Sequence, residues 1–128
     1  MVENILNEKP LQIFVIIAET LTGWKNPTTN EGKEVLMQHY AWAAELKSNG
    51  ILVLAGPTDF ELTSAGKINP IGHTTGLILI KAQSREDAEN WAFKDPFHVR
   101  GFRKNVLRSM KITMTDNSLF EPLEKLIN

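Results

Sequence analysis

Two residues far apart in this chain of 128 residues, His39 and Asp95, are the strongest candidates for chemistry. His39 lies in a stretch whose apolar residues recur at the helical spacing of about 100° per residue. The residues of this apolar arc are Val35, Leu36, Tyr40, Trp42, Ala43 and Leu46. A buried imidazole without a hydrogen-bond partner costs about 1–3 kcal/mol. The position of His39 therefore predicts a polar partner elsewhere in the chain.

Asp95 fits the role of this partner. It continues an inward stripe formed by Ala88, Trp91 and Ala92, and Pro96 directly after it disfavours further helix. A carboxylate bonded to one ring nitrogen fixes the imidazole tautomer and leaves the other nitrogen to take or give a proton. The pair is a candidate general acid–base dyad. The alternative is a structural histidine bonded to a backbone carbonyl or a tyrosine.

Other side chains could complete a site around the pair. Trp42 and Phe97 could line a cavity, although aromatic residues more often belong to a core. Arg103 could bind a ligand carboxylate or be solvated. His73 and His98 are further titratable candidates, but the histidines do not have metal-ligand spacing.

Other reaction classes lack their motifs. The chain has no cysteine, which excludes thiolate catalysis and disulfides. It also has no nucleophile elbow, phosphate-binding loop or dinucleotide glycine pattern. We therefore expect neither a metal nor a cofactor.

Four strands and two helices are expected to position these residues within a single domain spanning residues 1–128, with a core at about 11–115. The hydrophobic patterns predict strands over residues 11–18, 51–55, 74–82 and 105–115, and helices over 31–48 and after Ser84. This order is the split βαβ arrangement of a ferredoxin-like α+β fold, βαββαβ, with a four-stranded antiparallel sheet. Residues 58–73 should form a long hairpin loop or a ragged β-extension, and residues 118–127 a short terminal helix.

Local signals set the expected element ends. The first helix should begin at a capping box of Thr28 and Glu31 or at an Asn30 cap, and Gly50 should end it. Gly56 and Pro57 should end the second strand. The apolar residues of the last strand, expected to be its buried set, are Val106, Met110, Ile112 and Met114.

Composition limits the partners. The chain has 14 basic and 15 acidic residues, without the basic excess typical of nucleic-acid binding. The apolar run over residues 11–18 is shorter than the roughly 20 residues that a membrane span needs. No signal peptide is evident, so a cytoplasmic protein is expected.

The first three strands are apolar on both faces, whereas two helices cover only one face of such a sheet. A second copy packed sheet against sheet would cover the other face and enclose a cavity. The alternative is that the terminal helix folds over that face. We expect the homodimer.

Three segments resemble the YCII-like family of the dimeric α/β-barrel superfamily: HYAWAAELKSNG, ILVLAGP and SREDAENWAFKDPFHVRGF with its DPF. The resemblance implies a fold that dimerises through its sheets and a His–Asp pair at a cavity. It assigns the histidine to His39 and the acid to Asp95, with Asp59 as a competitor. The expected substrate-binding residues are Trp42, Gly56, Pro57, Phe97, His98 and Arg103.

The resemblance also suggests an activity, because some related proteins act as dehydrochlorinases or muconolactone-type isomerases. We therefore expect a cofactor-free lyase or isomerase that transfers a proton on a small aromatic or cyclic acid. The alternative is a non-catalytic protein that binds a small ligand or has an accessory role. A cofactor-free monooxygenase is a further possibility, but no motif supports it.

Overall fold

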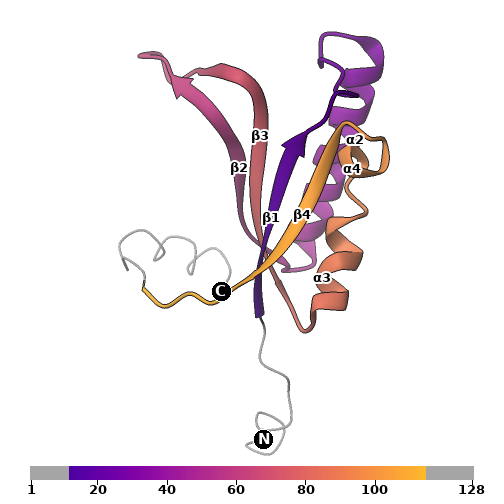
Figure 1. Ribbon diagram of the computed structural model, residues 1–128, viewed down its shortest axis with the longest axis vertical. Helices are drawn as coiled ribbons and strands as arrows, with labels where there is room; N and C mark the ends of the chain where they lie inside the picture. Colours follow the sequence, from indigo (N-terminus) through magenta and orange to yellow (C-terminus); the bar gives the residue numbers. More distant parts are fainter. Residues whose placement is uncertain (1–11, 115–128) are drawn as a thin grey trace, which may run out of the picture.

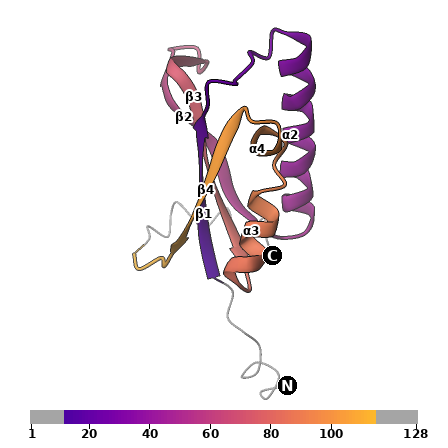
Figure 2. The same ribbon diagram turned by 45° about the vertical axis from the view of Figure 1, so that its right-hand side comes forward.

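Four antiparallel strands form one sheet, and helices pack on one of its faces (Figures 1 and 2). This computed structural model describes residues 12–114, and within β3 the side chains of residues 68–74 are not described. The elements are β1 Gln12–Thr20, α2 Asn30–Ser48, β2 Leu52–Leu62, β3 Ile68–Ala82, α3 Arg85–Ala92, α4 Pro96–Val99 and β4 Arg103–Met110. The spatial strand order is β2-β3-β1-β4. The predicted ferredoxin-like α+β architecture is confirmed.

β1 lies inside the sheet and shows how the two faces differ. Phe14, Ile16 and Ala18 point toward the helices and are buried, whereas Ile13, Val15 and Ile17 are only half-buried. The inner set joins Trp42 and Leu46 of α2 in the core, as strand alternation requires. The opposite face of the sheet carries no helix among the described residues.

α2 is close to its predicted extent, but its cap is different. Thr29 is the N-cap, and its hydroxyl accepts a 3.0 Å hydrogen bond from the Gly32 N–H, so neither Thr28 nor Asn30 has this role. Gly50 follows the helix with φ +70, a conformation that glycine adopts without strain, which confirms the predicted end. Tyr40 was wrongly placed in the buried arc. It is 58% exposed because it lies beyond the edge of the apolar stripe.

The second predicted strand was too short. Gly56 and Pro57 lie within β2, which continues to Leu62 and pairs with β3. Proline is tolerated there because β2 is an edge strand with one unpaired side. The ragged β-extension is therefore the correct alternative for most of residues 58–73, with a register shift between Thr58 and Phe60. The β2–β3 hairpin bends away from the helices (Figure 1).

The last predicted strand had the right location but the wrong inner face. β4 ends at Met110, so Ile112 and Met114 lie beyond it and are exposed. Its buried residues are Arg103, Asn105 and Leu107. The alternation misled because two of these inward residues are polar, whereas the apolar set at even positions lies on the face that no described helix covers.

The segment after β3 follows the prediction and adds one element. Ser84 caps α3 by accepting from the Asp87 N–H, and Ala88 and Ala92 are buried. A further short helix, α4, follows, with Asp95 as its N-cap. The segment therefore ends in a carboxylate that faces the interior.

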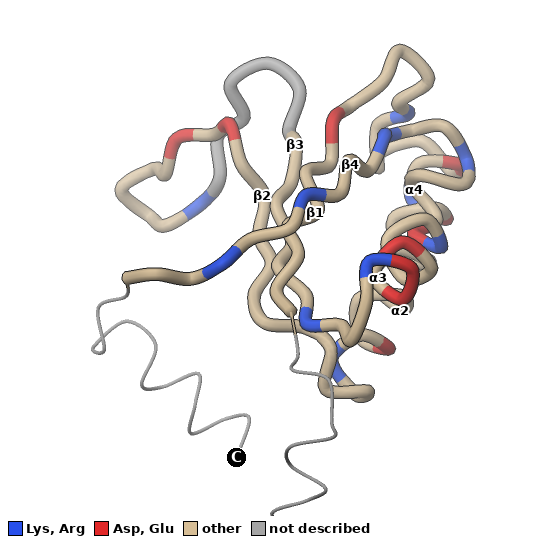
Figure 3. Tube along the Cα trace, turned by 60° about the horizontal axis from the view of Figure 1, so that its bottom comes forward, with Lys and Arg blue, Asp and Glu red and all other residues tan. Residues whose placement is uncertain are grey.

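Charged side chains are distributed unevenly over the helices and the sheet. Figure 3 shows acidic and basic residues on the helices, whereas β1, β2 and β3 are uncharged over most of their length. No helix among the described residues is long and apolar enough to cross a membrane. The predicted terminal helix over residues 118–127 lies outside the described residues.

Candidate active site

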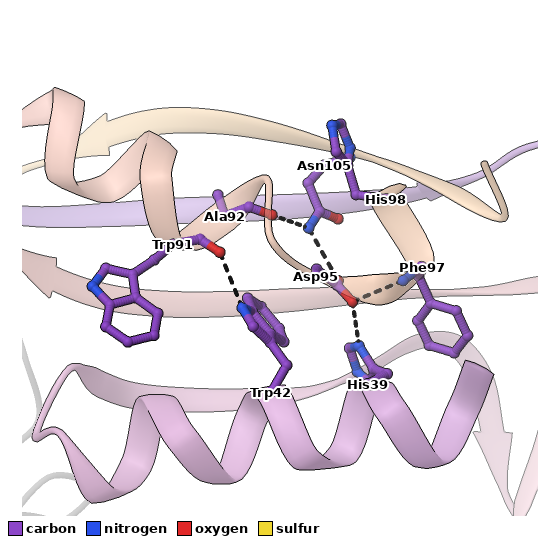
Figure 4. A network of polar contacts seen from close by, with 8 residues as sticks. All are labelled: His39, Trp42, Trp91, Ala92, Asp95, Phe97, His98 and Asn105. Carbon is purple, nitrogen blue, oxygen red and sulfur yellow. Dashed lines mark hydrogen bonds and ion pairs between the residues drawn. The ribbon is translucent and has the colours of Figure 1, made fainter. Parts of the chain in front are cut away.

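The structure brings His39 and Asp95 together from two helices. His39 Nδ1 lies 2.7 Å from Asp95 Oδ1 (Figure 4). Asp95 is fully buried, whereas the His39 side chain is 14% exposed. Because an ionised carboxylate can only accept, Nδ1 carries the proton in a neutral imidazole, which leaves Nε2 as an acceptor. Among the residues that the structure describes, none is hydrogen-bonded to Nε2.

Two further donors hold the Asp95 carboxylate in place. The Phe97 N–H donates to Oδ1 at 3.1 Å, which caps α4. Asn105 Nδ2 donates to Oδ2 at 3.0 Å and also to the Ala92 carbonyl at 2.8 Å (Figure 4). Both oxygens are therefore satisfied, as a buried carboxylate requires. The aspartate cannot turn away from His39 without losing these bonds.

Asp59, the competing acid, has a different position. It lies in β2 with φ +61, and the hydroxyls of Thr75 and Thr58 both donate to its carboxylate. These two hydrogen bonds hold the pKa of Asp59 below its ordinary value of 3.8. Its hydrogen bonds thus go to the β2–β3 hairpin, and Asp95 is the acid at His39.

A cavity of about 760 Å³ lies beside the imidazole. It is bounded by α2 on one side and by the inner face of the sheet on the other, so it forms within one chain. This space lies on the helix side of the sheet, and the cavity between the two sheets of a dimer stays a prediction. Its lining includes five of the six expected substrate-binding residues: Trp42, Gly56, Pro57, Phe97 and Arg103.

His98 is the expected residue that the cavity does not include. Its Nδ1 accepts from the Asn105 N–H at 3.0 Å, and its ring stacks on Phe93 at 4.9 Å. These contacts hold it on the other side of Asn105 from Asp95 (Figure 4). The side chain of His73 lies outside the described residues.

Aromatic rings form the wall next to the imidazole. The ring of Phe97 lies 4.4 Å from that of His39, and the ring of Trp42 lies 5.5 Å away. Trp42 is held by a 3.0 Å hydrogen bond from its Nε1 to the Trp91 carbonyl. The wall is therefore rigid and apolar, which suits a flat ligand.

Arg103 is buried rather than solvated. Its Cζ lies 4.8 Å from the Trp24 ring and 4.7 Å from the Phe97 ring, within the range of cation–π contacts. Burial lowers the pKa of Arg103 below its ordinary value, and the charge of Asp95 acts in the opposite direction. An arginine keeps its proton at neutral pH even so. The cavity thus contains a dehydrated cation.

Sequence reasoning missed two polar residues. Asn105 anchors Asp95, and Thr75 lines the cavity with its hydroxyl near Asp59. Asn105 could have been found only if the inner face of β4 had been assigned correctly. Among the described residues, no group of three His, Cys, Asp or Glu could hold a metal ion.

Comparisons with known proteins agree with this architecture. The model of a family described as the YCII-related domain matches residues 14–109. A solved structure of similar fold is 5-chloro-2-hydroxyhydroquinone dehydrochlorinase from Burkholderia phenoliruptrix AC1100 in complex with 2,5-dihydroxybenzoquinone. It aligns with a TM-score of 0.54 and 18% identity over 77% of this chain and 93% of that chain, a likeness in fold alone. A search of curated proteins finds no match.

Proposed function

This chain belongs to the YCII-related family, and from that premise we propose that it is a cofactor-independent enzyme of the lyase or isomerase type. The proposed reaction is a proton transfer on a small aromatic or cyclic acid, such as dehydrochlorination or lactone isomerisation. The observation that carries the proposal is the 2.7 Å contact between His39 Nδ1 and Asp95 Oδ1 at the edge of the cavity.

In this proposal His39 is the base. Asp95 fixes the tautomer and balances the charge of the imidazolium that forms when Nε2 takes a proton. Because Asp95 is buried and hydrogen-bonded at both oxygens, it holds the ring in a fixed orientation. Nε2 then acts on a group held in the cavity.

The cavity residues supply binding. Trp42 and Phe97 would hold a flat ring beside the imidazole, Gly56 and Pro57 would shape the sheet side, and Arg103 would attract an acidic ligand. The dehydrochlorinase of similar fold acts on a chlorinated hydroquinone and was solved with a hydroxylated quinone, ligands of this size and shape. This supports a small ring compound as the substrate.

A non-catalytic ligand-binding or accessory protein is the second candidate, and one observation favours it. Asp95 also caps α4 and bonds Asn105, so its carboxylate has a structural role whether or not a reaction takes place. A histidine bonded to such an aspartate could be a link between α2 and α4.

Comparing His39→Gln with the wild type separates the two candidates. Both proteins are screened with chlorinated hydroquinones, small lactones and aromatic acids, following ligand binding by thermal shift and turnover by chloride release or absorbance. A lost general base lowers kcat by about 10²–10⁴-fold. We expect His39→Gln to lose turnover on this scale and to keep ligand-induced stabilisation.

Met37→Gln is the matched control, because it places the same residue on an exposed position of α2 that does not line the cavity. It should behave as the wild type. Undiminished turnover in His39→Gln would refute the proposal. Ligands that stabilise the wild type without any turnover would favour the binding protein.

A further inference from the structure

Arg103 and His39 contact the same aromatic ring. The guanidinium Cζ lies 4.7 Å from the centre of the Phe97 ring, and the imidazole lies 4.4 Å from it. Both side chains line the cavity. A base and a cation therefore lie against the same aromatic ring in the wall of one cavity.

The guanidinium has a fixed place on the cavity floor. Gly76 of β3 lies beneath it, because a Cβ at this glycine would be 3.5 Å from Arg103 Nη1. Trp24 covers it at 4.8 Å. With rings of Trp24 and Phe97 against the planar group, its N–H donors are directed along its edge.

The charge in the cavity has one sign. The ionisable side chains in its lining are His39, Tyr40 and Arg103, and no carboxylate is among the lining residues that the structure describes. Asp95 is fully buried behind the imidazole. A desolvated cation interacts more strongly with an anion than an exposed one does. The cavity therefore favours a ligand on which negative charge is present or develops.

We infer that Arg103 binds a ring oxygen on which negative charge grows as His39 removes a proton from the other side of the same ring. The substrate is then a conjugated phenol, quinol or cyclic enone whose oxygen is attached to the ring itself. A carboxylate substituent carries its charge outside the conjugated ring, so that charge does not grow during the proton transfer. This inference rests on the proposed function, since it presumes that His39 acts as a base.

The proposed reaction moves one proton and one electron pair within the substrate ring. His39 Nε2 takes a proton from a tetrahedral ring C–H of the enone or keto tautomer, or from an O–H conjugated to its carbonyl, and the electron pair of that bond moves through the conjugated system to the carbonyl oxygen at Arg103. The oxygen becomes an oxyanion that the guanidinium stabilises by charge-assisted hydrogen bonds. In a dehydrochlorination the pair returns and forms a new ring double bond, and chloride leaves a tetrahedral ring carbon with the electrons of its carbon bond. In an isomerisation the imidazolium returns the proton at another ring atom.

Binding of two probes tests the inference. The first is 2,5-dihydroxybenzoquinone, whose anion carries its charge on ring oxygens, and the second is benzoate, whose charge lies on a substituent. Arg103→Met should weaken binding of the quinone anion by about tenfold to hundredfold, the value of a hydrogen bond to a charged group. Benzoate should bind more weakly to the wild type and change little in the variant.

Further variants guard against misfolding. Arg103→Lys keeps the positive charge and disturbs the packing less than methionine does. It should weaken binding of the quinone anion by an intermediate factor, because lysine lacks the planar guanidinium with its paired donors. Arg108→Met removes an exposed arginine from the same strand and should leave both affinities unchanged. Circular dichroism establishes that each variant is folded.

Two results would overturn the inference. One is an unchanged affinity for the quinone anion in folded Arg103→Met and Arg103→Lys. The other is an equal loss for benzoate, which would make Arg103 a carboxylate anchor. Failure of the proposed function is visible separately, because His39→Gln should retain quinone binding and lose only turnover. If the wild type binds the quinone anion through Arg103 but shows no turnover, the role of His39 as a base is refuted. The role of Arg103 in binding the anion is then retained.

Discussion

The Asp95 carboxylate accepts hydrogen bonds from three separate parts of the chain. They are the His39 ring of α2, the Phe97 N–H at the start of α4, and the Asn105 amide of β4. A fully buried carboxylate is stable only with such partners. The geometry of His39 therefore depends on β4 as well as on the helix that carries it.

Asn105→Ala should lower kcat by about tenfold to hundredfold with little change in KM. The substitution removes the donor to Asp95 Oδ2, so the carboxylate and the imidazole bonded to it lose their fixed orientation. Stability should fall by about 1–3 kcal/mol, because Oδ2 and the Ala92 carbonyl are left without this donor. Steady-state kinetics and thermal unfolding measure the two effects.

Asn49→Ala is the control for Asn105→Ala. Asn49 Nδ2 donates to the Glu45 carbonyl at the exposed end of α2, so its loss affects stability alone. Full turnover in Asn105→Ala, despite a loss of stability, would assign Asn105 a structural role only.

The pairing of His39 with Asp95 was predictable because each residue interrupts an apolar helical stripe. Such an interruption is costly unless the two polar groups meet. Asn105 was not predictable in the same way. In its strand Arg103 and Asn105 lie on the inner face, whereas Val106 and Met110 lie on the outer face, so alternation alone assigned the wrong set to the core.

At the scale of elements, the loop before α2 rests directly on the helix. A Cβ on Gly32 would lie 2.1 Å from the Asn26 carbonyl oxygen, which is far too close. Asn26 and Pro27 line the cavity, and Trp24 in the same loop contacts Arg103. The position of this loop on Gly32 therefore shapes the cavity.

Gly32→Ala should destabilise the protein by about 1–3 kcal/mol, the usual cost of forcing extra volume into a packed site. It should also weaken ligand binding, because the loop must move away from the helix. Thermal unfolding and the quinone titration measure these effects. Lys33→Ala, an exposed change at the next position, should have neither effect. Equal behaviour of the two variants would contradict the prediction.

The elements themselves were largely predictable where one local signal decides them. Ser84 and Gly50 delimit helices through their own hydrogen bonds and backbone conformation. The extent of β2 was not predictable, because Pro57 is compatible with a strand only at a sheet edge. Whether a strand lies at the edge depends on how the whole sheet is assembled, so the sequence around Pro57 does not predict it.

At the scale of the whole molecule, the sheet face opposite the helices is apolar. Its half-buried residues include Ile13, Val15, Ile17, Leu77 and Val106. We predict that a second copy covers this face, so light scattering should give twice the chain mass of 14.4 kDa. The dimeric barrel stays a prediction until that measurement is made.

Val15→Glu tests which face is used, because it places a charge on the central strand of the open face. It should reduce the mass to that of a monomer, whereas Met37→Glu on the exposed side of α2 should leave the dimer intact. A monomeric wild type at micromolar concentration would refute the prediction.

The double use of Asp95 has a consequence for how this protein can change over evolutionary time. Loss of its carboxylate would remove the cap of α4 as well as the partner of His39. A descendant that catalysed no reaction would therefore still be selected to keep the aspartate, simply in order to fold. The presence of the pair in a relative thus indicates shared ancestry, and activity has to be assessed from the groups in the cavity that the fold does not need.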